Sequence, residues 1–278
     1  MRKITLVLLS IAFALSGALA QKPIASKTMA VFRGQQPESF ALFNPGTPSK
    51  EDARQYVDQS FSLTIRPEVL DALRKANAGL IHLQLPSPVN ITLDLYRADV
   101  FSHEAMITTT DGRTFAPNSD YLFYRGMISG NPNSLAIVSV LGDDIQIVFA
   151  DESGNKRIQP ASDGKYILFD DADIRVPKNL NCFVDESGDL NPLEESDDLP
   201  NRLLTGNCVE IYVECDFKSY QDNGSSVPNT EAWVAALWNE VITLYENEDI
   251  PVAVSDVLVY TSTDPFAGLN TTSAVLGA

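Results

Sequence analysis

Histidine is almost absent from this chain. Its 278 residues include two, His82 and His103. A catalytic zinc ion held by three imidazoles therefore cannot be built from this sequence. The segment "HEAMI" at residues 103–107 begins like a zinc-binding helix, but Ile107 stands where the second histidine would be needed. Neither His103 nor Glu104 is therefore assigned a catalytic role.

Cysteine is scarce as well, with three residues at positions 182, 208 and 215. In an oxidising compartment an odd number leaves at least one cysteine unpaired or joined to another chain. Cys208 and Cys215 lie seven residues apart in one predicted strand, so their side chains point to opposite faces and cannot bridge each other. Cys215 falls on the apolar face, where we expect a small buried hydrophobic residue.

Basic side chains are outnumbered. The chain has 20 Lys and Arg residues against 37 Asp and Glu residues, a net charge of −17 at pH 7. Such a charge argues against nucleic acids and anionic lipids as partners. No segment after residue 20 is long and apolar enough for a membrane span, so none is expected.

The first twenty residues have the pattern of a secretory signal peptide. Arg2 and Lys3 precede the apolar run "ITLVLLSIAFALSG", and the small-residue end at Ala18-Leu19-Ala20 suits cleavage before Gln21. This order predicts that residues 1–20 are removed and that the mature chain is secreted, to the extracellular space or a periplasm.

The remaining chain divides at an acidic stretch. Residues 185–200, "DESGDLNPLEESDDLP", hold seven carboxylates and two prolines, which predicts a solvated linker over 185–204. Residues 21–184 are predicted to be a β-rich antiparallel domain with a short helix in "RPEVLDALRKANAG". Its short alternating segments are separated by turns such as Asp111-Gly112 and Gly142-Asp143.

Residues 205–278 have a different pattern. "CVEIYVECDF" alternates like a strand, and "PVAVSDVLVYT" is a second strand. Between them "NTEAWVAALWNEVITLYENEDIP" has helical periodicity, with Asn229 or Thr230 as N-cap. An apolar stripe is expected on the core face of this helix, and its members are Trp233, Leu237, Val241 and Leu244, widened by Val234, Trp238 and Tyr245. These three segments together predict a β-α-β unit with parallel strands. The fold class predicted for the whole chain is α+β, with the β-rich domain preceding an incomplete α/β unit.

These segments resemble the reprolysin or ADAM-like zinc metallopeptidases, a group of metzincins. The β-α-β segments resemble the opening strand, first helix and second strand of the catalytic domain, and "YRGMISGNPNSLAIVSV" resembles the tyrosine-arginine-glycine, then glycine, then serine pattern of the propeptides. Together they cover about a third of the mature chain. The resemblance implies a metzincin-like fold for residues 205–278, as the truncated start of a catalytic domain that follows a propeptide.

The function implied by this resemblance is that of a secreted zinc-dependent metalloendopeptidase precursor. Its propeptide would contact the catalytic domain and keep it latent, and its substrates would be proteins or peptides. The family's H-E-x-x-H-x-x-G-x-x-H motif is absent, so the zinc ligands of the full-length protein are not in this chain, and the chain by itself is expected to be inactive. The alternative is a secreted β-rich binding or protease-inhibitory protein with no catalytic activity.

The resemblance also suggests two metal ligands. Cys182, in "PKNLNCFVDESG", corresponds to the propeptide cysteine whose thiolate fills the open position on the catalytic zinc. Phe183 replaces the usual glycine after that cysteine, and a disulfide from Cys182 to Cys208 is the alternative. Glu210, in the first strand, corresponds to a ligand of a structural calcium ion, with a solvated strand residue as the alternative.

Overall fold

The computed structural model describes residues 22–49, 57–161, 165–175 and 208–269. The predicted signal peptide, the acidic linker and Cys182 lie outside the described residues. The described chain is a mixed α+β structure that is mostly strand. Described residues up to 175 are called the N-terminal half below, and residues 208–269 the C-terminal half.

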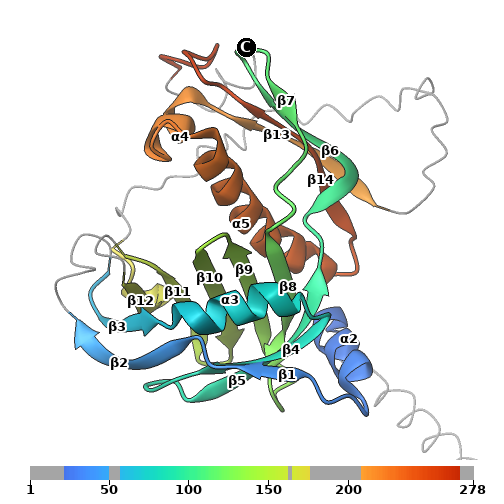
Figure 1. Cartoon of the computed structure of the whole chain (residues 1–278), viewed down its shortest axis with the longest axis vertical. Coiled ribbons are helices and arrows are strands. Elements are labelled where there is room, and N and C mark those ends of the chain that lie inside the picture. The colour runs from blue at the N-terminus through green and yellow to red at the C-terminus, as the bar shows by residue number, and fades with distance from the viewer. Residues whose placement is uncertain (1–21, 50–56, 162–164, 176–207, 270–278) are drawn as a thin grey trace, which may run out of the picture.

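Most of the N-terminal half forms one curled sheet of ten strands (Figure 1). These strands are β1 (Glu38–Phe40), β2 (Phe43–Ser49), β3 (Ser60–Ile65), β4 (Leu80–Leu85), β5 (Ile91–Ala98), β8 (Leu122–Ile128), β9 (Leu135–Leu141), β10 (Asp144–Asp151), β11 (Gly154–Pro160) and β12 (Tyr166–Asp170). Their spatial order is β1-β4-β5-β8-β9-β10-β11-β12-β3-β2. The antiparallel prediction is right for every neighbouring pair except β1 and β4, which are parallel.

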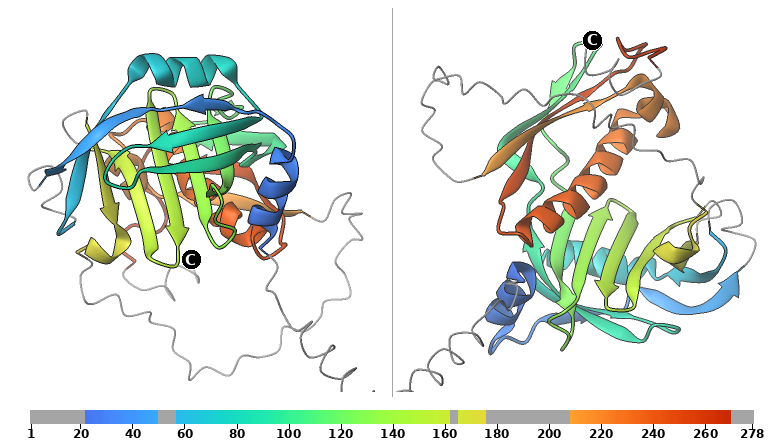
Figure 2. Two further views of the ribbon diagram at one scale, coloured as in Figure 1. Left: turned by 90° about the horizontal axis from the view of Figure 1, so that it is seen from below. Right: turned by 180° about the vertical axis from the view of Figure 1, so that it is seen from behind.

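One of the helices covers an end of this curled sheet (Figure 2). The helix predicted within residues 66–79 is α3 (Pro67–Ala76), which places Leu70 and Leu73 in the main hydrophobic core. Proline suits its first position because the N–H that it lacks has no partner at a helix start. The helix ends at Asn77, which adopts the left-handed conformation at φ 42°.

A second sheet combines the two halves of the chain. It contains β13 (Val209–Cys215), β14 (Val252–Val259), β6 (Phe101–Thr109) and β7 (Thr114–Phe115), in that order. β13 and β14 are parallel and flank α5 (Val227–Glu246), so the predicted β-α-β unit is confirmed. β14 also pairs in parallel with β6, a strand of the N-terminal half that the sequence analysis did not predict. The sheet therefore crosses the boundary drawn between residues 21–184 and 205–278.

Helix α5 lies between the two sheets (Figures 1 and 2). The face that it buries there differs from the face expected from the sequence. Four of the seven residues that were expected in the core are instead exposed, namely Trp233 (41%), Leu237 (42%), Leu244 (59%) and Tyr245 (46%). The buried face includes Val234 and Ala235 but also several polar residues. The prediction is right for Val234 and wrong for the four exposed residues, because hydrophobic periodicity does not register polar side chains whose partners come from another part of the chain.

The start of α5 differs as well. Its N-cap is Ser226, whose hydroxyl accepts a hydrogen bond from the backbone N–H of Asn229 at 3.4 Å, so neither Asn229 nor Thr230 caps the helix. Three short elements complete the fold, and none of them was predicted. They are α2 (Pro23–Phe32), the 3₁₀ turn η1 (Asp171–Asp173) and α4 (Phe217–Asp222).

A second hydrophobic core joins the halves. Val100, Tyr121 and Phe123 of the N-terminal half are buried in one cluster with Val234 and Ile242 of α5. At about 25 cal/mol per Å² of apolar surface, burial of this kind supplies most of the attraction between packed elements. The two halves therefore share a hydrophobic core as well as a sheet.

Gly126, in β8, provides a test of how the large sheet is packed. A Cβ atom built on Gly126 would lie 1.9 Å from the carbonyl oxygen of Asp94 in β5. We expect Gly126→Ala to lower the free energy of unfolding by about 3 kcal/mol or to prevent folding, because the clash is with backbone that cannot rotate away. The measurement is urea unfolding followed by circular dichroism.

The matched control is Gly79→Ala. Nothing lies within 4 Å of a Cβ atom at Gly79. This variant should unfold within about 1 kcal/mol of the parent protein. Equal stability of the two variants would contradict the close approach of β5 and β8.

Candidate functional site at the contact between the two halves

Helix α5 carries three acidic side chains and no basic one. The acids are Glu231, Glu240 and Glu246, and each accepts hydrogen bonds from the N-terminal half. A buried or half-buried carboxylate needs such partners because loss of its hydration is costly. These three contacts define the candidate site.

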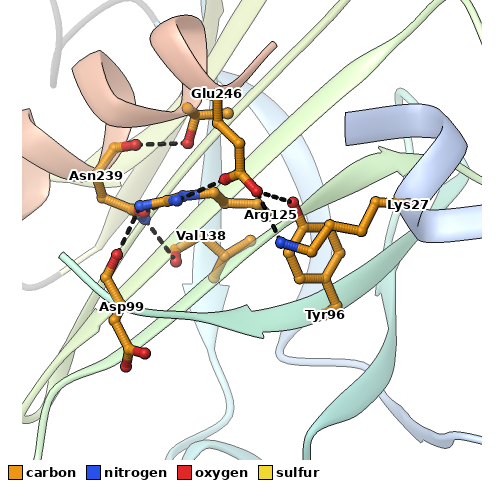
Figure 3. A network of polar contacts seen from close by, with 8 residues as sticks. Lys27, Tyr96, Asp99, Arg125, Val138, Asn239 and Glu246 are labelled. Carbon is orange, nitrogen blue, oxygen red and sulfur yellow. Dashed lines mark hydrogen bonds and ion pairs between the residues drawn. The ribbon is translucent and has the colours of Figure 1, made fainter. Parts of the chain in front are cut away.

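Arg125 is the central residue of the site (Figure 3). It lies in β8, within the Tyr124-Arg125-Gly126 motif, and is only 4% exposed. Its Nη1 donates to Oε2 of Glu246 at 2.7 Å, and its Nε donates to Oδ1 of Asn239 at 3.2 Å. Its Nη2 donates to the carbonyl oxygen of Asp99 at 2.9 Å. The planar guanidinium can make these bonds in three directions at once, which a lysine ammonium on a single stem does not reproduce.

Glu246 receives donors from three elements. Besides Arg125, the Nζ of Lys27 in α2 lies 2.7 Å from its Oε1, and the hydroxyl of Tyr96 in β5 donates to the same oxygen at 3.2 Å. The ammonium of Lys27 also lies 4.4 Å from the centre of the Tyr96 ring. This geometry allows a cation–π contact. One carboxylate at the end of α5 thus binds α2, β5 and β8 together.

The electrostatics of Glu246 favour its charged form. Burial alone would raise the pKa of this carboxyl, but hydrogen bonds from Lys27 and Arg125 outweigh burial and leave the pKa below its ordinary value. Burial and the neighbouring charge of Glu246 raise the pKa of Tyr96, which therefore remains a neutral hydrogen-bond donor.

Asn239 fixes the middle of α5 against the large sheet. It is fully buried, and its Nδ2 donates to the carbonyl oxygen of Val138 at 3.2 Å and to the hydroxyl of Ser139 at 3.0 Å. Both acceptors belong to β9, while its Oδ1 accepts from Arg125. All of the amide's polar atoms are therefore engaged by the N-terminal half, as a buried amide requires.

The other two acids of α5 have simpler partners. Arg157 of β11 donates through Nη1 to both oxygens of Glu240 at 3.0 and 2.9 Å, and through Nε to Asp171 at 2.9 Å. Glu231 accepts from the backbone N–H of Asn118 at 2.6 Å. Burial raises the pKa of both Glu240 and Glu231, and their partners offset that effect only in part.

The backbone adds a strand contact to these side-chain contacts. β6 pairs with β14 from Val254 to Val259, and the N–H of Val254 donates to the carbonyl oxygen of Val100 at 2.9 Å. An N-terminal strand thus completes the hydrogen bonding along β14, which is the geometry of strand addition to a sheet edge.

The predicted metal ligands are not brought together. Cys182 lies outside the described residues, and Glu210 is exposed on β13, at the edge of its sheet. His82 lies with its Nδ1 2.8 Å from Oδ1 of Asp94, whereas His103 is exposed on β6. Within the described ranges no group of three His, Cys, Asp or Glu side chains is placed to hold a metal ion. These residues therefore do not fit a zinc site, and the roles of Cys182 and Glu210 stay predictions.

Cys208 and Cys215 do not form a disulfide with each other, as expected. Cys215 is 2% exposed, as expected for a small hydrophobic residue, and burial raises the pKa of its thiol to about 12. Cys208 is only partly buried. Cys182 lies outside the described residues, so its zinc thiolate and its disulfide to Cys208 both stay predictions.

Comparison with known proteins adds no identity. No protein-family model matches the chain, and no curated protein sequence matches it. Among the helices of the described residues, none has both the length and the apolar character needed to cross a membrane.

Sequence reasoning missed most of this site. Arg125 stood in the quoted Tyr-Arg-Gly segment, but no partner was assigned to it. The available signal was on α5, where Glu231, Asn239 and Glu246 interrupt an otherwise apolar helix. Polar residues in an apolar helix indicate either a solvated face or a bonded interface, and the sequence alone does not distinguish them.

Replacement of Arg125 tests the central contact. We expect Arg125→Met to lower the free energy of unfolding by about 3 kcal/mol, because the change removes the donor to Oδ1 of Asn239 and to Oε2 of Glu246. Arg125→Lys should recover only part of this loss, since lysine keeps the positive charge but cannot donate hydrogen bonds in the same three directions. Urea unfolding measures both variants.

Arg113→Met is the control for this substitution, because Arg113 pairs with Asp111 at the surface, with side-chain exposures of 58% and 49%. It should cost less than about 0.5 kcal/mol. An Arg125→Met protein as stable as this control would show that the buried network contributes nothing.

The lowered pKa of Glu246 predicts a pH dependence. A carboxyl whose pKa is lower in the folded state contributes stability above its unfolded pKa, near 4.5, and loses that contribution as the pH falls through the folded value. The stability difference between the parent and Glu246→Gln should therefore be full at pH 6–7 and shrink below about pH 4.5.

This difference, from urea unfolding at each pH, isolates Glu246. Glu231 and Glu240 have raised pKa values and shift stability in the opposite sense, but they are present in both proteins. A difference that stays constant from pH 7 to pH 3 would contradict the assignment.

Proposed function

We propose that the N-terminal half is a pro-segment that holds the β13–α5–β14 unit in the precursor of a secreted zinc metalloendopeptidase. One observation carries the proposal. Arg125 belongs to the motif that resembles the family's propeptides, and its guanidinium is buried against the helix that resembles the first helix of the catalytic domain. The two parts of the resemblance were identified separately in the sequence, and they meet at this residue.

The shared sheet supports the same proposal. Because β6 pairs with β14 and the second hydrophobic core contains residues of both halves, the C-terminal half depends on the N-terminal half for its packing. A pro-segment that helps its enzyme to fold and keeps it latent would have such a contact. An independent β-rich binding module would not need one.

The proposed zinc would be held by residues that this sequence does not include. The described histidines do not fit the metal, so no catalytic step is assigned to this chain. Calcium is likewise given no structural role in the described residues, since Glu210 is proposed as its ligand from the resemblance alone.

The proposal is tested on the secreted precursor that contains this chain. Its zinc content is measured by mass spectrometry, and hydrolysis of a protein substrate is followed before and after cleavage within residues 176–207. We expect bound zinc, no hydrolysis before cleavage, and chelator-sensitive hydrolysis once the halves separate. A separated protein with neither zinc nor hydrolysis would reject the enzyme and favour the secreted binding or inhibitory protein.

Cys182 provides a separate prediction about latency. If its thiolate occupies the open position of the proposed zinc, Cys182→Ala gives a precursor that hydrolyses substrate without cleavage. Cys208→Ala is the matched control and should remain latent. Unchanged latency of Cys182→Ala, or a disulfide between Cys182 and Cys208 found by thiol titration of the unfolded precursor, would reject the thiolate.

A further inference from the structure

A pocket of about 510 Å³ lies where the two halves meet. One wall is formed by Asp144 and Gln146 of β10, in the N-terminal half. The opposite wall is formed by Asp222, Asn223 and Trp233, around α4 and the first turns of α5. None of the contacts described for Arg125 lies in this pocket, so it is distinct from the buried network.

The lining of this pocket has a consistent chemistry. Among the described residues, its charged members are the carboxylates of Asp144 and Asp222, and no lysine or arginine lines it. Gln146 and Asn223 add amide groups, and Trp233 is 41% exposed. A tryptophan ring is the best aromatic partner for a cation, and carboxylate and amide oxygens accept the hydrogen bonds that a cation donates.

We propose that this pocket binds an arginine or lysine side chain of a peptide or protein partner. The cationic group lies against Trp233 and between Asp144 and Asp222, and the amides bind its remaining N–H groups. The inference does not depend on the proposed protease function, because it rests on the pocket and its charges alone.

Both carboxylates already have hydrogen-bonding partners, and these partners determine how freely each can bind a cation. Asp222 pairs with Lys218, one turn earlier in α4, and both side chains are exposed. Asp144 accepts a bond from the hydroxyl of Tyr166 at 3.3 Å and keeps its second oxygen for another donor. A bound cation must therefore compete with Lys218 at Asp222, whereas it meets no competing base at Asp144.

The position of the pocket has a further consequence. Because its walls come from both halves, the ligand binds only while the halves are in contact. By linkage, a ligand that binds only this arrangement stabilises it in proportion to the logarithm of the ligand concentration. A basic partner would thus hold the halves together.

The probe is an acetylated and amidated Gly-Arg-Gly-Arg-Gly peptide, with a Gly-Gln-Gly-Gln-Gly peptide as the uncharged reference. Binding to the full chain is measured by calorimetry at 150 mM NaCl, and by tryptophan fluorescence in a Trp238→Phe variant, in which Trp233 is the remaining tryptophan. We expect the arginine peptide to bind at one site, at least tenfold more tightly than the glutamine peptide. Equal binding of the two peptides would overturn the proposal in favour of an uncharged ligand.

Two double variants distinguish binding in the pocket from general attraction to the negatively charged surface. Asp144→Asn with Asp222→Asn should weaken binding at least tenfold, whereas Glu38→Gln with Glu152→Gln, which removes the same charge elsewhere on the surface, should change it less than twofold. Equal losses in the two double variants would show nonspecific attraction and overturn the proposal.

Lys218 gives the test in the opposite direction. Lys218→Gln frees Asp222 and should tighten binding severalfold, while Lys75→Gln on α3 makes the same change in net charge without effect. If neither lysine variant alters the affinity, the ligand does not use Asp222 and the proposed site is wrong.

Discussion

The buried guanidinium of Arg125 constrains how the two halves are arranged. A charged group that is 4% exposed has lost its hydration and must recover the energy from fixed partners. Its partners are a backbone carbonyl at Asp99, an amide at Asn239 and a carboxylate at Glu246. Two of the three come from α5. Loss of either α5 partner while the halves stay packed would leave a buried group without its bonding partner, which is costly.

Arg125 also links the side-chain contacts to the strand contact. The carbonyl that it binds belongs to Asp99, which lies between β5 and β6. At this point the chain leaves the large sheet, and the next residue, Val100, enters the core shared with α5. β6 then pairs with β14. The hydrogen bond from Arg125 to Asp99 therefore fixes the bend that carries an N-terminal strand into the second sheet.

Local patterns predicted the local parts of this fold. Alternation located β13 and β14, periodicity located α3 and α5, and the turn at Gly142 follows from a glycine with φ 67°. These features depend on residues close in sequence. The pairing of β6 with β14 joins segments about 150 residues apart, and nothing in either segment specifies the other.

The face of α5 could not be predicted for a related reason. The helix has apolar residues around most of its circumference, so the stripe through Trp233 and Leu237 was a reasonable choice for the core. The face that is buried contains Asn239 and Thr243, which have satisfied polar atoms and no exposure. Hydrogen bonds between residues about a hundred positions apart decided which face of α5 is buried, and they outweighed hydrophobicity. Such bonds can be recognised only when the positions of both partners are known.

The distribution of charge explains why the acids of α5 serve as the contact. The C-terminal half carries eleven acidic side chains and one basic side chain, Lys218. It cannot neutralise its own buried carboxylates, so Lys27, Arg125 and Arg157 of the N-terminal half do so. Because basic residues are the minority in this chain, their placement at α5 decides which surface the N-terminal half recognises. Such part-buried pairs are also screened by salt far less than the remaining surface charges. The contact between the halves can therefore persist at ionic strengths that weaken long-range attraction of the acidic surface for basic partners.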